Sequence, residues 1–332
     1  REHLGGELFN EFSTDDAASA WHKDSIEKLL SYMNVDNSRL TLLSRSTAYA
    51  WYDHNYIEVL ETNATGESLV TKQGQSARKT IHKIRAKEVI LATGAHERPM
   101  LFETNDLANI MLSQSVRRYL NEFGVISGKD IVLYGNNDSI YSTAIDLNNK
   151  NIKCTVVDVR SSEVQSEMIE KAKALDIKVF QGYAILKANG THLVQSIELS
   201  QVVLQGKEWN FSGGSEQLKC DLLATSGGFN PVVHLDCHCG AKTFYDEVSQ
   251  SFLPQKERNN RQVCGSVAGV GAWQDAVSDA KNKAQLTLKS LGIVKKINQD
   301  KLSTNYLNFF NVSQFFTPVE ILNRPKVFLD MQ

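Results

Sequence analysis

The sequence has little of several features that would assign a chain to a class at once. Only 5 of its 332 residues are cysteines and only 5 are prolines. The cysteines are odd in number and scattered, so they indicate no disulfide framework, and a reducing, cytoplasmic location is predicted. The sequence contains no run of roughly 18 or more apolar residues, which a membrane helix requires, so no membrane partner is expected. The formal net charge of −2 argues against a nucleic-acid partner as well.

The pattern of apolar residues predicts an α/β fold. Hydrophobic residues make up 42% of the chain, enough for a large core, and the length favours two domains. Short apolar runs that end in glycine or an acid, typical of buried parallel strands, cover residues 87–94, 131–135, 152–158 and 221–227. Helical spacing marks residues 111–120, 139–150, 162–175 and 275–288, and the first of these helices is expected to stop at Gly124. The stretches 56–84 and 183–211 alternate over short runs and predict antiparallel strands.

Glycine motifs that suit a dinucleotide occur in separate segments. Gly5-Gly6 resembles the turn after the second strand of a dinucleotide-binding domain, where the absence of Cβ lets backbone approach a cofactor. Thr93-Gly94, in LATGAHERP, ends a predicted strand, and ATSGGFNP repeats this element further along the chain. Gly265-Ser266 precedes a predicted helix, whose N-terminus suits a phosphate or the edge of a flavin ring.

The middle of the chain carries a degenerate version of the dinucleotide fingerprint. After the run 131–134, a working G-x-G-x-x-G requires small residues, but the sequence is Gly135-Asn136-Asn137-Asp138-Ser139-Ile140. Asn137 stands where the second glycine admits the pyrophosphate, and Asp138 adds a negative charge beside it. We therefore expect this domain to keep the fold and to have lost its nicotinamide site.

Three segments, in this order, resemble the α subunit of heterotetrameric sarcosine oxidases: LATGAHERPMLFETNDLANIMLSQSVRRYLNEFGV, GNNDSIYSTAIDL and ATSGGFNPVVHL. The closing KVFLDMQ resembles the stretch that leads into that subunit's C-terminal half. The resemblance implies a two-dinucleotide-binding-domain flavoprotein, disulfide-reductase-like, with a second α/β domain inserted in the first. It also implies a fragment that lacks the N-terminal glycine-rich turn and the C-terminal folate-binding domain.

The implied domains follow from the same resemblance. Residues 1–105 and 225–292 would form a discontinuous FAD/NAD-binding-like domain, residues 106–224 an inserted NADH-binding-like domain with a degenerate fingerprint, and residues 293–332 an arm or linker. Carried over onto this sequence, the cofactor-binding positions are Arg1, Gly5, Gly6, Glu7, Ala48, Thr93, Gly94, Gly265, Ser266, Gly271 and Trp273.

The activity implied is that of an oxidoreductase subunit carrying NAD and contacting FMN at a subunit interface. The complex would oxidatively demethylate sarcosine to glycine, with hydrogen peroxide and methylene-tetrahydrofolate as further products. FAD and tetrahydrofolate would bind elsewhere in the assembly, whose beta and other subunits are the implied partners. The substrate pocket would lie in another chain, so no catalytic residue is predicted here and the isolated piece is expected to be inactive.

Two other clusters favour structural roles over chemistry. The sequence His234-x-Asp236-Cys237-His238-Cys239 resembles a metal cluster, but structural zinc usually takes ligands from two separated pairs, so no metal site is predicted. The run His96-Glu97-Arg98 holds a base, an acid and a cation, yet local pairing of Glu97 with Arg98 is the favoured interpretation.

Two alternatives to this function remain open. In the first alternative, the chain is an equivalent subunit of an opine or proline dehydrogenase. In the second, it is a cofactor-free scaffold that only holds partner subunits. Co-purified NAD or flavin separates the scaffold from the other two, and substrate turnover with the partner subunits separates those.

Overall fold

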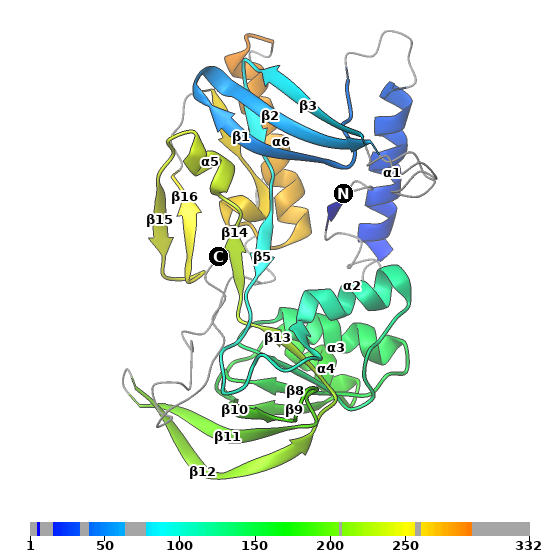
Figure 1. Cartoon of the computed structure of the whole chain (residues 1–332), viewed down its shortest axis with the longest axis vertical. Coiled ribbons are helices and arrows are strands. Elements are labelled where there is room, and N and C mark those ends of the chain that lie inside the picture. The colour runs from blue at the N-terminus through cyan, green and yellow to red at the C-terminus, as the bar shows by residue number, and fades with distance from the viewer. Residues whose placement is uncertain are drawn as a thin grey trace. The chain divides into compact units, whose positions relative to one another are not determined.

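A computed structural model describes residues 5–6, 16–33, 40–63, 78–205, 208–255 and 260–293. The chain forms two compact units (Figure 1). Unit 1 comprises Arg1–Ala95, Pro231–Tyr245 and Phe252–Thr304, and unit 2 comprises His96–Asn230, Asp246–Ser251 and Asn305–Gln332. The domain ranges and the arm expected from the sequence stay predictions; all of the arm after Ile293 lies outside the described residues.

Unit 2 contains a five-stranded parallel sheet in the order β6-β13-β7-β8-β9. Its strands are β6 (Ile110–Leu112), β13 (Leu222–Ser226), β7 (Ile131–Gly135), β8 (Cys154–Asp158) and β9 (Lys178–Gln181). Three helices connect them: α2 (Ser113–Phe123), α3 (Ser139–Asn149) and α4 (Glu167–Ala174). These strands and helices confirm the parallel α/β arrangement that the apolar runs predicted.

The sheet is buried on both faces, which explains why its strands read as unbroken apolar runs. Ile131 and Leu133 of β7 pack with the helices, whereas Val132 and Tyr134 pack with an antiparallel meander. The meander comprises β10 (Tyr183–Asn189), β11 (Ser196–Gln205) and β12 (Glu208–Lys219). Figure 1 shows the helices and the meander on opposite sides of this sheet. Alternate side chains of one strand therefore build two cores.

Unit 1 contains a three-stranded antiparallel sheet and a separate pair of short parallel strands. The sheet comprises β1 (Ser46–Tyr52), β2 (Tyr56–Asn63) and β3 (Arg78–Arg85), and the pair comprises β4 (Val89–Leu91) and β17 (Arg261–Val263). The helices of this unit are α1 (Asp16–Met33), α5 (His234–His238) and α6 (Trp273–Ser290), with short 3-10 turns η2 (Asp53–Asn55) and η3 (Gly265–Ala268). No described helix is long and apolar enough to cross a membrane.

Two further strand pairs occur where the chain passes from one unit to the other. They are β5 (Ala95–Glu97) with β14 (Phe229–Pro231), and β15 (Thr243–Asp246) with β16 (Ser251–Pro254).

Several predicted boundaries were wrong. The helix expected over 162–175 begins only at Glu167, because the Ser166 hydroxyl accepts a hydrogen bond from Ile169 N (3.2 Å) and caps α4 there. The helix expected from Met111 begins at Ser113, since Ile110–Leu112 pairs with β13 as a strand. Its predicted end at Gly124 is confirmed, because this glycine caps α2 in the left-handed conformation.

Candidate functional site

The two glycine loops of unit 1 leave neighbouring strands at the same edge. Leu91 pairs with Val263 in the parallel ladder of β4 and β17, and Cys264 N continues it by donating to Leu91 O (3.0 Å). Thr93-Gly94 follows β4, and Gly265-Ser266 follows β17. Because the carboxyl ends of parallel strands meet at one edge, four of the predicted cofactor-binding residues lie at a shared edge.

Backbone geometry explains the glycine at position 94. Gly94 has a φ of +79°, and a Cβ built there meets no atom of the described residues within 4 Å. Its carbonyl accepts from Val232 N (2.9 Å), and the Thr93 hydroxyl donates to Val232 O (2.7 Å), so two hydrogen bonds to Val232 hold the loop. The loop is thus fixed in a conformation that favours glycine, beside space that no described side chain fills.

The second loop is held by an acid of α6. Gly265 has a φ of +73°, and its N–H donates to the Asp279 carboxylate (2.9 Å). Asp275, in the first turn of α6, is also buried, and the N-cap residue Ala272 supplies no side-chain hydrogen bond to the helix. Negative charge in the first two turns complements the helix dipole but opposes a phosphate. This end of the site fits an uncharged ribose or ring better than a pyrophosphate.

The remaining predicted site residues are less closely grouped. Trp273 is the first residue of α6, and its ring centroid lies 5.8 Å from that of Trp21 on α1. Ala48 lies half-buried in the separate sheet, opposite Val59 of β2. The other positions are placed as follows: Gly271 precedes α6, Gly5 and Gly6 adopt positive φ values of 116° and 59°, and Arg1 and Glu7 lie outside the described residues.

In unit 2, a side-chain amide fills the turn between β7 and α3. Asn137 Nδ2 donates to Ser226 O and Ser226 Oγ (both 3.1 Å), while Asn137 Oδ1 accepts from Ser139 N (3.0 Å) and Ser139 Oγ (2.7 Å). Asn137 is fully buried. The N-terminal amide that would face a bound phosphate therefore already has an acceptor inside the protein.

The segments 234–239 and 96–98, for which structural roles are predicted, make structural contacts. His238 Nδ1 lies 2.8 Å from Trp51 O, and Cys239 Sγ lies 3.6 Å from Tyr52 O, so α5 is fastened to β1. Among the described residues, no group of three or more His, Cys, Asp or Glu could hold a metal ion. Glu97 accepts from Gln114 N (2.7 Å) at the start of α2, and Arg98 donates to Gln250 O (2.6 Å).

Comparison with curated proteins finds sarcosine oxidase alpha subunits. The sarcosine oxidase alpha subunit of Corynebacterium sp. strain U-96 is 37% identical over 239 residues, 72% of this chain and 24% of the relative. That of strain P-1 is 34% identical over 263 residues, 79% of this chain and 26% of the relative. The resemblance to sarcosine oxidase alpha subunits is confirmed. The chain spans about a quarter of the length of these relatives.

A relative named for another substrate matches less well. An opine oxidase subunit of Rhizobium meliloti is 24% identical over 274 residues, 78% of this chain and 51% of the relative. No protein-family profile matches the chain.

Solved structures confirm the predicted fold class. Thioredoxin reductase of T. acidophilum superposes with a TM-score of 0.59 at 15% identity, covering 88% of each chain. L-proline dehydrogenase of P. horikoshii superposes with a TM-score of 0.58 at 17% identity, covering 94% of this chain and 56% of the other. At these identities the superpositions show the fold alone.

Proposed function

We propose that this chain is the alpha-subunit portion of a sarcosine oxidase, carrying NAD in unit 1 and contacting FMN at a subunit interface. The observation that carries the proposal is the alignment with sarcosine oxidase alpha subunits, up to 37% identical over 239 residues. The loops that the resemblance assigns to the cofactor leave β4 and β17 at one edge.

The proposed complex demethylates sarcosine to glycine, with hydrogen peroxide and methylene-tetrahydrofolate as further products. FAD and tetrahydrofolate bind elsewhere in the assembly, and the partners are the beta and other subunits of the oxidase. The proposed location is the cytoplasm, in keeping with five free cysteines among the described residues.

The residues at this edge fit part of a dinucleotide. The open space at Gly94 admits a group against bare backbone, and the Asp275 and Asp279 carboxylates disfavour a phosphate near α6. We therefore assign the ribose and nicotinamide end to the loops of Gly94, Gly265 and Ser266. The pyrophosphate contacts would come from residues other than these, among them the proposed positions Gly5 and Gly6.

A matched pair of glycine substitutions tests the cofactor site. Gly94 and Gly182 have nearly equal φ values of +79° and +80°, and neither has an atom of the described part of the chain within 4 Å of a built Cβ. Alanine strains both backbones alike, but Gly182 belongs to unit 2, which is not the unit proposed to carry NAD. In the native complex, Gly94→Ala should lose NAD, measured after denaturing the purified protein, and Gly182→Ala should retain it. Equal NAD content in both variants would show that the site is wrongly placed.

A substrate test separates the proposal from its nearest rival. The likeness to the opine oxidase subunit makes the corresponding part of an opine-oxidising enzyme the second candidate. The native complex is supplied with sarcosine and, separately, with an opine, and oxygen uptake is followed. Oxygen uptake with the opine but not with sarcosine would overturn the sarcosine proposal. It would leave intact the proposed role of this chain as part of an oxidase complex.

A further inference from the structure

Unit 2 has the fold that holds NAD(P)H in dinucleotide-binding proteins, with a strand β7, a turn, the helix α3 and a second strand β8. In such a unit, an acid at the end of the second strand binds the ribose hydroxyls and the turn before the helix holds the pyrophosphate. Asp158 is the acid at the end of β8, and residues 135–140 form the turn. Whether a dinucleotide fits depends on whether these groups are free.

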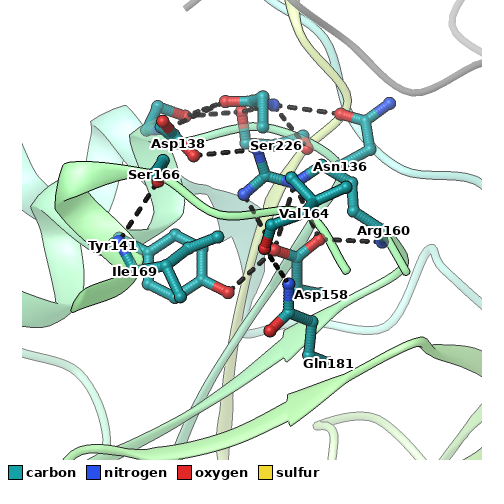
Figure 2. Close-up of polar contacts among 12 residues, drawn as sticks. Asn136, Asp138, Tyr141, Asp158, Arg160, Val164, Ser166, Ile169, Gln181 and Ser226 are labelled. Carbon is teal, nitrogen blue, oxygen red and sulfur yellow. Dashed lines mark hydrogen bonds and ion pairs between the residues drawn. The ribbon is translucent and has the colours of Figure 1, made fainter. Parts of the chain in front are cut away.

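The acceptor oxygens of Asp158 are already engaged. Oδ1 accepts from Arg160 N (2.9 Å) and Nε (3.0 Å), and Oδ2 accepts from Arg160 Nη2 (2.8 Å) and Tyr141 OH (2.7 Å). Asp158 and Tyr141 are fully buried, and Arg160 is 8% exposed. Figure 2 shows these side chains converging on one carboxylate. A ribose would have to displace a charge-assisted, buried network to reach Asp158.

The same arginine also reaches the turn. Arg160 Nη1 lies 2.8 Å from Asp138 Oδ1 in a buried ion pair, so one guanidinium joins the end of β8 to the start of α3. Burial by itself lowers the pKa of Arg160, but Asp158 and Asp138 outweigh it and hold the pKa above its ordinary value. The cation therefore stays charged between two carboxylates.

The loop that carries Arg160 is fastened in this position. Gln181 Nε2, at the end of β9, donates to Ser161 O (3.0 Å) and Val164 O (2.8 Å). Val159 N donates to Gly135 O (3.1 Å), which ties the loop to the turn itself. The loop that carries Arg160 is thus hydrogen-bonded both to the end of β9 and to the turn before α3.

We propose that the Arg160 side chain takes the place of a nucleotide in unit 2, occupying both the ribose acid and the pyrophosphate turn, so that this unit binds no NAD(P)H. Asn137 completes the replacement, because its amide oxygen accepts from Ser139 N at the start of α3. Removing Arg160 alone does not reopen the site, since Asp138 and Asp158 would then repel a pyrophosphate. The unit accordingly accepts no electrons from reduced nicotinamide nucleotides. This inference does not depend on the NAD proposed for unit 1.

Amide hydrogen exchange of the full chain, with and without millimolar NADH, tests the proposal. We expect no NADH-dependent protection over residues 135–141, whatever happens around Gly94 and Gly265. Saturable protection of the Asn136 and Asn137 amides would overturn it. Absence of NADH-dependent protection near Gly94 and Gly265 would instead count against the cofactor site of unit 1 and leave the proposal for unit 2 standing, so the two failures are distinguishable.

A variant series tests the bridging role. Arg160→Met should raise exchange over both 135–141 and 158–165 by at least tenfold, because both ends of the bridge are released. Arg118→Met removes an exposed arginine from an ion pair with Glu122 in the same unit and serves as the matched control. Should Arg160→Met fail to fold, Asp138→Asn weakens only the turn end and should raise exchange over 135–141 more than over 158–165. Exchange equal to that of Arg118→Met in these variants would refute the bridge.

Discussion

A buried ion pair between α2 and α3 offers a quantitative test of how unit 2 is stabilised. Arg117 Nε donates to Asp146 Oδ2 at 2.5 Å, and both side chains are fully buried. Asn121 Nδ2 donates to the same oxygen at 2.8 Å. The Asp146 carboxylate is therefore compensated mainly by one cation on the neighbouring helix.

Replacing Arg117 by methionine keeps most of the side-chain volume and removes the charge. The Asp146 carboxylate is then buried without its cation, a change that costs about 3–5 kcal/mol. At 1.4 kcal/mol for each factor of ten, amide protection in α2, α3 and β7 should fall by roughly two to three and a half orders of magnitude. The control is Arg118→Met on the same helix, whose exposed pair with Glu122 should contribute about 0.3–0.5 kcal/mol.

Native-state hydrogen exchange is the suitable assay, because it reports the opening of unit 2 separately from that of unit 1. The double variant Arg117→Met/Asp146→Leu removes both charges and should recover most of the lost protection. Protection in Arg117→Met within tenfold of that in Arg118→Met would refute the reasoning, since the buried pair would then be worth no more than an exposed one.

Four further outcomes are expected. Gly135→Ala should destabilise unit 2 by about 1–3 kcal/mol in urea unfolding, because its Cβ would lie 2.6 Å from Ser226 O. Gly214→Ala should not, because its Cβ meets none of the described atoms within 4 Å. At about pH 8, a thiol reagent should label the exposed Cys237 in the folded chain and spare three others. Burial raises the pKa of the thiol from 9.0 to about 12 in Cys154 and Cys220 and to about 11 in Cys264. The contribution of these buried, protonated thiols to stability is complete below pH 9 and should be lost as the pH rises toward the raised pKa values. A urea midpoint that stays unchanged across that pH range would contradict this. The purified chain alone should yield no peroxide from sarcosine above a heat-killed control, because the proposed substrate pocket lies in another subunit.

Much of the fold was predictable because the local sequence carries it. The runs 131–135 and 221–227 are apolar throughout since β7 and β13 lie inside a sheet covered on both faces. The glycine that ends α2 was predictable because the left-handed cap requires it. The helix α1 was missed. The strand β6 was mistaken for the start of a helix, because its three residues are too few to show a period of two.

The candidate site was predictable only at its glycines. Thr93-Gly94 and Gly265-Ser266 follow apolar runs and carry a recognisable pattern, whereas Asp279 lies fourteen residues beyond the glycine whose N–H it accepts. Acids at the third and seventh positions of a helix, as in α6, are common. Nothing in the spacing of Asp279 distinguishes it from an acid on the solvent-exposed face of a helix.

Residue type and spacing along the chain carry the resemblance to sarcosine oxidase alpha subunits, the α/β class and the loss of the glycine fingerprint at Gly135 to Ile140. These are local properties, because residue type and spacing express them directly. The group that fills the altered turn is evident only in the folded chain. Arg160 reaches Asp138 because β8 lies beside β7 in the sheet, which brings the loop after one strand to the turn after the other. Consecutive parallel strands are usually neighbours, so the adjacency is expected, but the position of Arg160 depends on the loop after β8, which Gln181 and Val159 hold by hydrogen bonds.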